Sequence, residues 1–197
     1  ELERRQPGIA ELAEAFGRGL RQFLSGAVVE YSGTGSALFD TAGAAVSFKV
    51  TGNGVFKTTH ISGGVRAFSL ANNGDVATLQ FDRIESRGQA IYSAGALTAV
   101  GNEAKSTAGT TLELRGASES MLNIDRVLSL SSTAVYIAGD STSCIVRLRA
   151  MLINNTSGYA FVFSSGTAYV DAFEISTSGG PTALQYSSSG SHPLYLR

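Results

Sequence analysis

The feature that most constrains this sequence is a repeat of short apolar segments at intervals of 21 to 26 residues. In one series, two residues separated by a single position recur seven times, and Ile91/Ser93 is the weakest member. The series is Val46/Phe48, Phe68/Leu70, Ile91/Ser93, Leu112/Leu114, Val135/Ile137, Phe161/Phe163 and Leu184/Tyr186. Self-similarity at such a period is typical of solenoids, in which each repeat stacks on its neighbour.

Two further apolar series keep the same period. The second passes through Leu79/Phe81, the neighbourhood of Val100, Leu122/Ile124, Val146/Leu148, Val170/Ala172 and Leu194/Leu196, and the third through Phe39, Ile61, Ile84, Ala104, Leu128, Ile153 and Ile175. Residues two apart point to the same side of a strand, so three strands without an intervening helix close a triangular coil. We predict an all-β fold, a right-handed parallel β-helix solenoid of about seven three-strand coils over residues 27–197.

An antiparallel sandwich is the alternative fold, although it gives no reason for three series to share one period. Clusters of Gly, Ser, Thr and Asn, such as Asn72-Asn73-Gly74, separate the apolar segments and indicate turns. In the third coil, Ala90 to Gly109, Ala and Gly replace the large apolar residues of the other coils. We therefore expect that coil to be thinner or distorted.

The first 26 residues follow a different pattern. Apolar residues at spacings of three and four, including Leu12, Phe16, Leu20 and Leu24, alternate with charged residues, and Pro7 suits a first helical turn. This pattern predicts an N-terminal amphipathic α-helix over residues 1–26. The helix would cap the apolar end of the solenoid, or dock the chain onto other proteins of a larger assembly.

Composition removes several classes of partner. Charged residues make up only 16% of the chain and its formal net charge is -1, so electrostatics favours neither nucleic acid nor an anionic membrane surface. No apolar run approaches the roughly 18 to 20 residues that span a bilayer. The single cysteine, Cys144, lies in an apolar segment, where we expect a buried free thiol and not a nucleophile.

Charged residues follow the second series at outward positions. The alignment predicts one external column of Lys57, Asp82, Asp125, Arg149 and Asp171, about 4.8 Å apart, which favours a structural salt-bridge ladder. Alternatively, Asp82, Asp125 and Asp171 form the catalytic face of a polysaccharide lyase or hydrolase, because glycoside hydrolysis uses two nearby carboxyl groups. Arg149 argues against catalysis, since a basic neighbour favours the ionised form of a carboxylate whereas the reaction needs a proton donor.

Other side chains suggest binding, and none suggests a metal or a cofactor. Five tyrosines fall at outward or turn positions, where their rings could stack on sugars, although amphipathic tyrosines are also ordinary at strand ends. They are Tyr92, Tyr136, Tyr159, Tyr169 and Tyr195, of which the first three are the candidates for glycan binding. His60 and His192 lie some six coils apart in the alignment, so they cannot share a metal ion. No phosphate-binding loop or nucleotide fingerprint is present, and we expect no cofactor.

Residues 27–197 resemble the right-handed β-helix, pectin-lyase-like superfamily through inward pairs such as those of Tyr159-Ala160-Phe161-Val162-Phe163-Ser164-Ser165-Gly166. The charge-poor layout, rich in Gly, Ser and Thr, also resembles bacteriophage tailspike and tail-fibre proteins. That resemblance implies a structural virion-surface component, commonly a homotrimer, that binds host surface polysaccharide and sometimes depolymerises it. It carries over no catalytic residue. A bacterial surface adhesin, also extracellular, is the remaining alternative.

Overall fold

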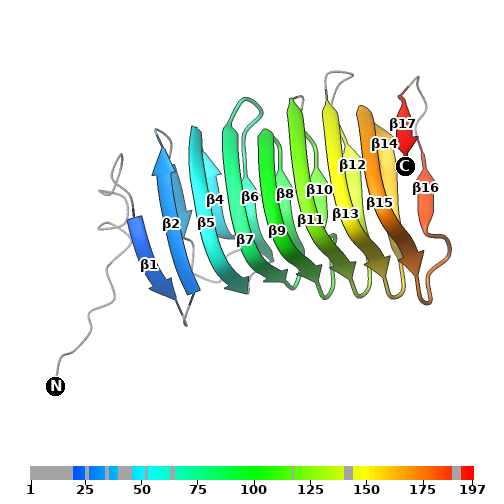
Figure 1. The fold of residues 1–197 in the computed structure, drawn as a ribbon, viewed down its shortest axis with the longest axis horizontal. Helices are drawn as coiled ribbons and strands as arrows, with labels where there is room; N and C mark the ends of the chain where they lie inside the picture. The colour runs from blue at the N-terminus through cyan, green and yellow to red at the C-terminus, as the bar shows by residue number, and fades with distance from the viewer. Residues whose placement is uncertain are drawn as a thin grey trace.

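The computed structural model describes residues 20–24, 27–33, 36–39, 46–51, 53–62, 65–116, 118–139, 144–187 and 192–197. Within these ranges the chain forms strands and no helix (Figure 1). The strands are β1 (Leu20–Leu24), β2 (Ala27–Gly33), β3 (Ser36–Phe39), β4 (Val46–Thr51), β5 (Asn53–Ser62), β6 (Arg66–Leu70), β7 (Val76–Ser86), β8 (Gln89–Ser93), β9 (Ala96–Ser106), β10 (Leu112–Leu114), β11 (Glu119–Ser129), β12 (Thr133–Ala138), β13 (Ile145–Asn155), β14 (Tyr159–Ser165), β15 (Thr167–Thr177), β16 (Leu184–Tyr186) and β17 (Leu194–Leu196). A helix that could cross a membrane is absent from this described part of the chain.

The strands form two sheets that run the length of the molecule. One has the order β1-β2-β5-β7-β9-β11-β13-β15-β17 and the other the order β16-β14-β12-β10-β8-β6-β4-β3. From β4 onward the chain alternates between the sheets, and β4 and its successors pair in parallel with the next strand of the same sheet. Figure 1 shows this stacking in chain order along the long axis. Six register steps from β4 to β16 give about six turns, one fewer than predicted.

The first apolar series is confirmed from the second coil onward. Phe68, Ile91, Leu112, Val135, Phe161 and Leu184 occupy one register column of the eight-stranded sheet. All but Leu184 have no exposed surface, and each buried apolar side chain of this size stabilises the fold by about 1.5–3 kcal/mol. In the first coil the register differs by two residues, because Phe48 and Val50 lie beside Phe68 and Leu70.

The second and third predicted series belong to one long strand, so each turn has two strands and not three. In β7, inward and outward residues alternate as far as Phe81. The next two residues, Asp82 and Arg83, are both exposed, and the alternation resumes with Ile84. The hydrogen-bonded ladder continues past this bend. The bend therefore shifts the alternation by one residue without ending the strand.

This shift changes the members of both series. Val146 pairs with Ser120 and Ala168, so Leu148 is the residue beside Leu122. Val127, not Leu128, continues the third series, because it pairs with Ala104 and Ile153. The prediction is correct that alternate residues point inward. In these coils, however, it aligns Val146 with the wrong residue of β11 and selects Leu128 in place of Val127.

The small residues of the third coil make room for a ring from the second. Val100 is exposed, and the inward positions are Ala99 and Gly101. A Cβ added at Gly101 would lie 2.4 Å from the ring of Phe81, which fills that space. The small residues of the third coil therefore leave a space that the Phe81 ring of the second coil fills.

The predicted N-terminal helix is wrong where the structure can test it. Residues 1–19 lie outside the described ranges, and Leu20–Leu24 forms β1. This strand pairs antiparallel with β2, with Leu24 beside Ala27, and β2 pairs antiparallel with β5. Pairing with the valine-containing strand β2 gives Leu20–Leu24 hydrogen-bond partners along one edge, and such tertiary pairing outweighs a helical spacing of apolar residues.

A column of small polar side chains forms the corner after each long strand. Ser86, Ser106, Ser129, Asn155 and Thr177 are register neighbours. Asn155, which has no exposed surface, donates to the carbonyls of Ser132 and Tyr159 and accepts from the N–H groups of Ser157 and Gly158. These bonds satisfy the turn backbone, and every buried side-chain N or O atom in the described residues has a partner.

Candidate functional site

The outer surface of the long strands, here called the outer face, carries three columns of side chains before the bend. Outward residues alternate along each strand, and the parallel register aligns them between strands. Column one contains Thr98, Met121, Arg147, Tyr169 and Tyr195. Column two contains Val100, Asn123, Arg149, Asp171 and Arg197. Column three contains Asp82, Asn102, Asp125, Met151 and Phe173.

A groove of about 540 Å³ runs between columns one and two, across strands β9 to β17. Its floor is formed at positions whose side chains point into the core, namely Ala99, Leu122, Leu148 and Val170. Side chains of the two columns form its walls. Because the groove crosses the strands, it can accept an extended ligand that lies along the solenoid.

The first wall is a stack of aromatic and guanidinium groups. The Arg147 guanidinium carbon lies 4.5 Å from the centroid of the Tyr169 ring, and the rings of Tyr169 and Tyr195 are stacked 4.8 Å apart. Arg147 Nε also donates to Glu119 Oε1 at 2.7 Å. Both faces of the Tyr169 ring are therefore covered, and Tyr169 offers a ligand its edge and hydroxyl group.

The second wall contains one of the predicted catalytic candidates. Asp171 is exposed and is the register neighbour of Arg149. Neither residue forms an ion pair within the described part of the chain. Asn123, Arg197 and the apolar Val100 complete this wall, which can donate and accept hydrogen bonds from Asn123 to Arg197.

The structure does not bring the three candidate carboxylates together. Asp82 and Asp125 belong to column three, whereas Asp171 belongs to column two. Asn102 lies between Asp82 and Asp125 and donates from Nδ2 to Asp82 Oδ1 at 3.0 Å. The predicted charge column is also wrong at its start, because Lys57 pairs with Gln80 and not with Asp82. Within the described residues no group of His, Cys, Asp and Glu is arranged to hold a metal ion.

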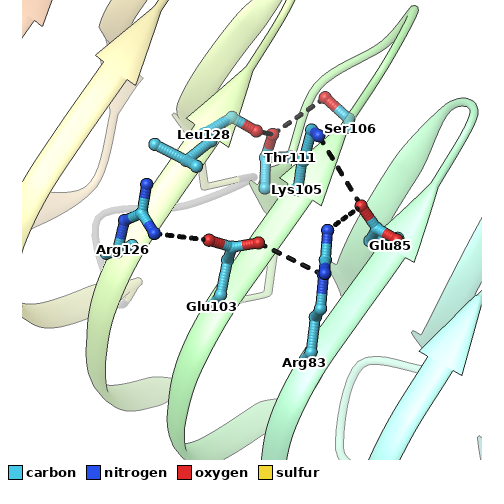
Figure 2. Close-up of polar contacts among 8 residues, drawn as sticks. All are labelled: Arg83, Glu85, Glu103, Lys105, Ser106, Thr111, Arg126 and Leu128. Atoms are coloured by element: carbon cyan, nitrogen blue, oxygen red, sulfur yellow. Dashed lines mark hydrogen bonds and ion pairs between the residues drawn. The ribbon is translucent and has the colours of Figure 1, made fainter.

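A salt-bridge ladder does exist, but it lies beyond the bend. Figure 2 shows Arg83 between Glu85 and Glu103, with Nη2 2.6 Å from Glu85 Oε1 and Nε 3.2 Å from Glu103 Oε1. Arg126 Nη1 lies 3.0 Å from Glu103 Oε2, and Lys105 Nζ lies 3.7 Å from Glu85 Oε1. Exposed ion pairs of this kind each stabilise a fold by about 0.2–1 kcal/mol, so this ladder is structural.

Tyr92 and Tyr136 lie on the other sheet, on either side of Glu113. Arg66 covers the ring of Tyr92 at 4.0 Å and Arg115 lies 5.6 Å from the centroid of Tyr136, so both rings have cationic neighbours. Glu113 is only 8% exposed and accepts hydrogen bonds from Arg115 and from the side-chain amide of Gln89. Desolvation acts to lower the pKa of Arg115. The hydrogen bond to Glu113 and the negative charge of Glu113 outweigh this effect, so the pKa of Arg115 is raised.

The remaining predicted residues lie apart from both surfaces. Tyr159 is half-buried on β14 and pairs with Thr133, so it does not join Tyr92 and Tyr136. Cys144 is buried and forms no disulfide, as predicted. His192 accepts a hydrogen bond at Nδ1 from the N–H of Gly166, and the side chain of His60 lies outside the described residues.

The most unusual part of the outer face is its C-terminal half. Phe173 is 84% exposed and Met151, beside it on the neighbouring strand, is 58% exposed. Met121 and Tyr195 in column one and Val100 in column two are also exposed and apolar, but polar side chains of column two separate column one from Met151 and Phe173. An adjacent pair as exposed as Phe173 and Met151 is typical of an interaction surface.

The structure thus contains a groove and an apolar surface on one face of a parallel solenoid. The sequence predicted Asp171, Tyr169 and Tyr195 at outward or turn positions, but it predicted neither the groove nor the apolar surface, since both depend on which outward columns share a face. Comparison of the chain with protein-family models, curated proteins and solved structures finds no match.

Proposed function

We propose that this chain is a non-enzymatic structural component of a virion surface, such as a fibre, spike or capsid-decorating protein, that associates with further copies of itself. In this proposal the coil is right-handed, as in the pectin-lyase-like superfamily. The observation that carries it is the exposed apolar surface around Phe173 and Met151. Burial of apolar area contributes about 25 cal/mol per Å², so an exposed surface of this kind favours association.

Sedimentation equilibrium over a range of protein concentrations tests self-association. We expect the average mass to rise with concentration above the 20.5 kDa of one chain. A chain that stays at that mass up to about 100 µM would contradict the proposal, because assembly on a particle requires contacts of at least this strength.

The groove favours a second candidate function, which is recognition of a host surface polysaccharide. Its walls combine tyrosine with arginine, asparagine and aspartate side chains, and such groups bind sugar hydroxyls and rings. Binding to envelope polysaccharides is measured by calorimetry, with Tyr195→Ala as the groove variant and Tyr136→Ala as its match on the other sheet. Loss of binding in Tyr195→Ala alone supports the groove. Loss in Tyr136→Ala alone, or absence of binding, contradicts it.

The enzymatic alternative has less support from the geometry. A lyase or hydrolase would use Asp82, Asp125 and Asp171, which lie in two columns and do not converge on one point. Any cleavage would appear as new reducing or unsaturated ends, and it would be abolished by Asp171→Asn if this alternative is correct. A bacterial adhesin would share the same scaffold, and the genes beside its own would separate that alternative from a virion protein.

A further inference from the structure

We propose that the outer face is a two-fold contact between two copies of this chain, with the axis parallel to the strands and midway between β13 and β15. This inference rests on the proposed self-association and specifies its partner and its surface. It follows from the residues that the register places side by side.

Each outward residue of β13 has a complementary neighbour on β15. Arg147 lies beside Tyr169, Arg149 beside Asp171, and Met151 beside Phe173. The register of the two strands sets all three pairs. Rotation about the proposed axis places β13 of one copy over β15 of the other, so each residue meets the same kind of neighbour across the interface.

The contacts that this rotation forms between columns one, two and three are complementary, and each occurs twice. Arg149 of one copy faces Asp171 of the other, which makes an ion pair between two groups that have no such partner within the described chain. Phe173 and Met151 bury the most exposed apolar surface of the face against each other. Arg147 of one copy faces the edge and hydroxyl group of Tyr169 of the other, because both faces of that ring are already covered.

The next strands extend the same pattern. The rotation places β11 over β17, so Met121 faces Tyr195 and Asn123 faces Arg197. The first pair is apolar and aromatic, and an asparagine oxygen can accept from a guanidinium group. The complementarity therefore covers the C-terminal half of columns one and two.

Other two-fold axes along the strands are less favourable. An axis on β13 would place Arg149 against its own copy, and an axis on β15 would do the same for Asp171. An axis between β11 and β13 would place Val100 against Asp171. An axis between β15 and β17 would pair Asp171 with Arg197 but would not place Met151 against Phe173. Charge complementarity together with burial of Phe173 and Met151 therefore favours the axis between β13 and β15.

The size of the face sets the expected strength of the contact. Before the bend, three strands each contribute seven residues, namely Glu119–Asp125 of β11, Ile145–Met151 of β13 and Thr167–Phe173 of β15. At about 3.3 Å per residue and 4.8 Å between strands, these segments cover roughly 330 Å². Stable interfaces bury about 800 Å² on each partner, so a contact of this size suits a weak, reversible dimer. The contact would also cover the groove, and dimer formation would exclude polysaccharide from it.

Charge reversal tests the pairing directly. Arg149→Asp and Asp171→Arg each place like charges across the two-fold axis, and we expect each to raise the dimer dissociation constant roughly a hundredfold. An equimolar mixture of the two variants restores both ion pairs and should form a heterodimer with nearly wild-type affinity. Arg87→Asp, on an exposed turn away from the face, is the control and should leave the constant unchanged.

Sedimentation velocity of the full chain separates the outcomes, with circular dichroism to confirm that each variant is folded. If wild type associates but the single variants associate equally well, or their mixture gains nothing, the two-fold contact is refuted while self-association stands. A wild-type trimer also refutes it, because a three-fold contact joins unlike surfaces. A wild-type monomer at about 100 µM refutes both proposals.

Discussion

The packing of Phe81 against Gly101 offers a sharp test of how neighbouring turns are aligned. A Cβ at Gly101 would lie 2.4 Å from the Phe81 ring, and Phe81 is itself buried. Ordinary carbon contacts begin near 3.4 Å, so Gly101→Ala requires the ring to move by about 1 Å. Overpacking of this size costs about 1–3 kcal/mol.

Removal of the ring has its own cost, but it also abolishes the clash. Phe81→Ala should destabilise the chain by about 3–5 kcal/mol, through lost burial and the cavity that remains. In the double variant the methyl group at position 101 enters that cavity, and the overpacking cost disappears. The double variant should therefore be more stable than the sum of the single effects by about 1–3 kcal/mol.

Urea denaturation followed by far-ultraviolet circular dichroism provides the free energies, since the chain contains no tryptophan. Phe81→Ala combined with Ala160→Gly is the control, because Ala160 lies on β14, several turns away. Its effects should add to within about 0.5 kcal/mol. Additive effects of Phe81→Ala and Gly101→Ala would refute the register of β7 and β9.

Two further predictions concern polar groups. Asn155→Ala should destabilise the chain by about 3 kcal/mol in urea denaturation, because it leaves four backbone groups of a buried corner without partners. Asn154→Ala is the control and should cost less than about 1 kcal/mol. Equal costs would contradict the role of Asn155 in the corner. Glu103→Gln should cost about 1 kcal/mol at low salt and less at high salt, because Glu103 pairs with Arg83 and Arg126. A salt-independent cost would contradict that ladder.

The sequence was informative wherever alternation is strict. The column from Phe68 to Leu184 could be predicted because an apolar residue recurs at the same phase in every turn. The long strands were harder, since two successive exposed residues at Asp82 and Arg83 shift the phase by one. Nothing in composition marks such a shift, so the series after it were assigned to a separate strand.

The same shift explains why the outer face was missed. Outward positions could be recognised, but placing Val146 beside Leu122 moved β13 by two residues relative to β11. Arg149 then appeared between Asp125 and Asp171. Its pairing with Asp171 is confirmed, but its neighbour on β11 is Asn123 and not Asp125. The recurrence of tyrosine at 169 and 195 was the available signal for a shared column.

The N-terminal residues show the limit of periodicity. Spacings of three and four fit a helix at Leu20 and Leu24, but a strand forms because β2 supplies hydrogen-bond partners that no local pattern can reveal. The choice between helix and strand is made there by a neighbour in space.

The parallel register that builds the outer face can be measured by distances between spin labels. Cysteines that replace Lys57, Gln80, Arg149 or Asp171, in a Cys144→Ala background diluted with unlabelled chain, would carry the labels. Lys57–Arg149 and Gln80–Asp171 each span four register steps, and Lys57–Asp171 spans five. At about 4.8 Å per step we expect roughly 19 Å for both four-step pairs and 24 Å for the five-step pair. Unequal four-step distances, or a five-step distance no longer than they are, would contradict the parallel register.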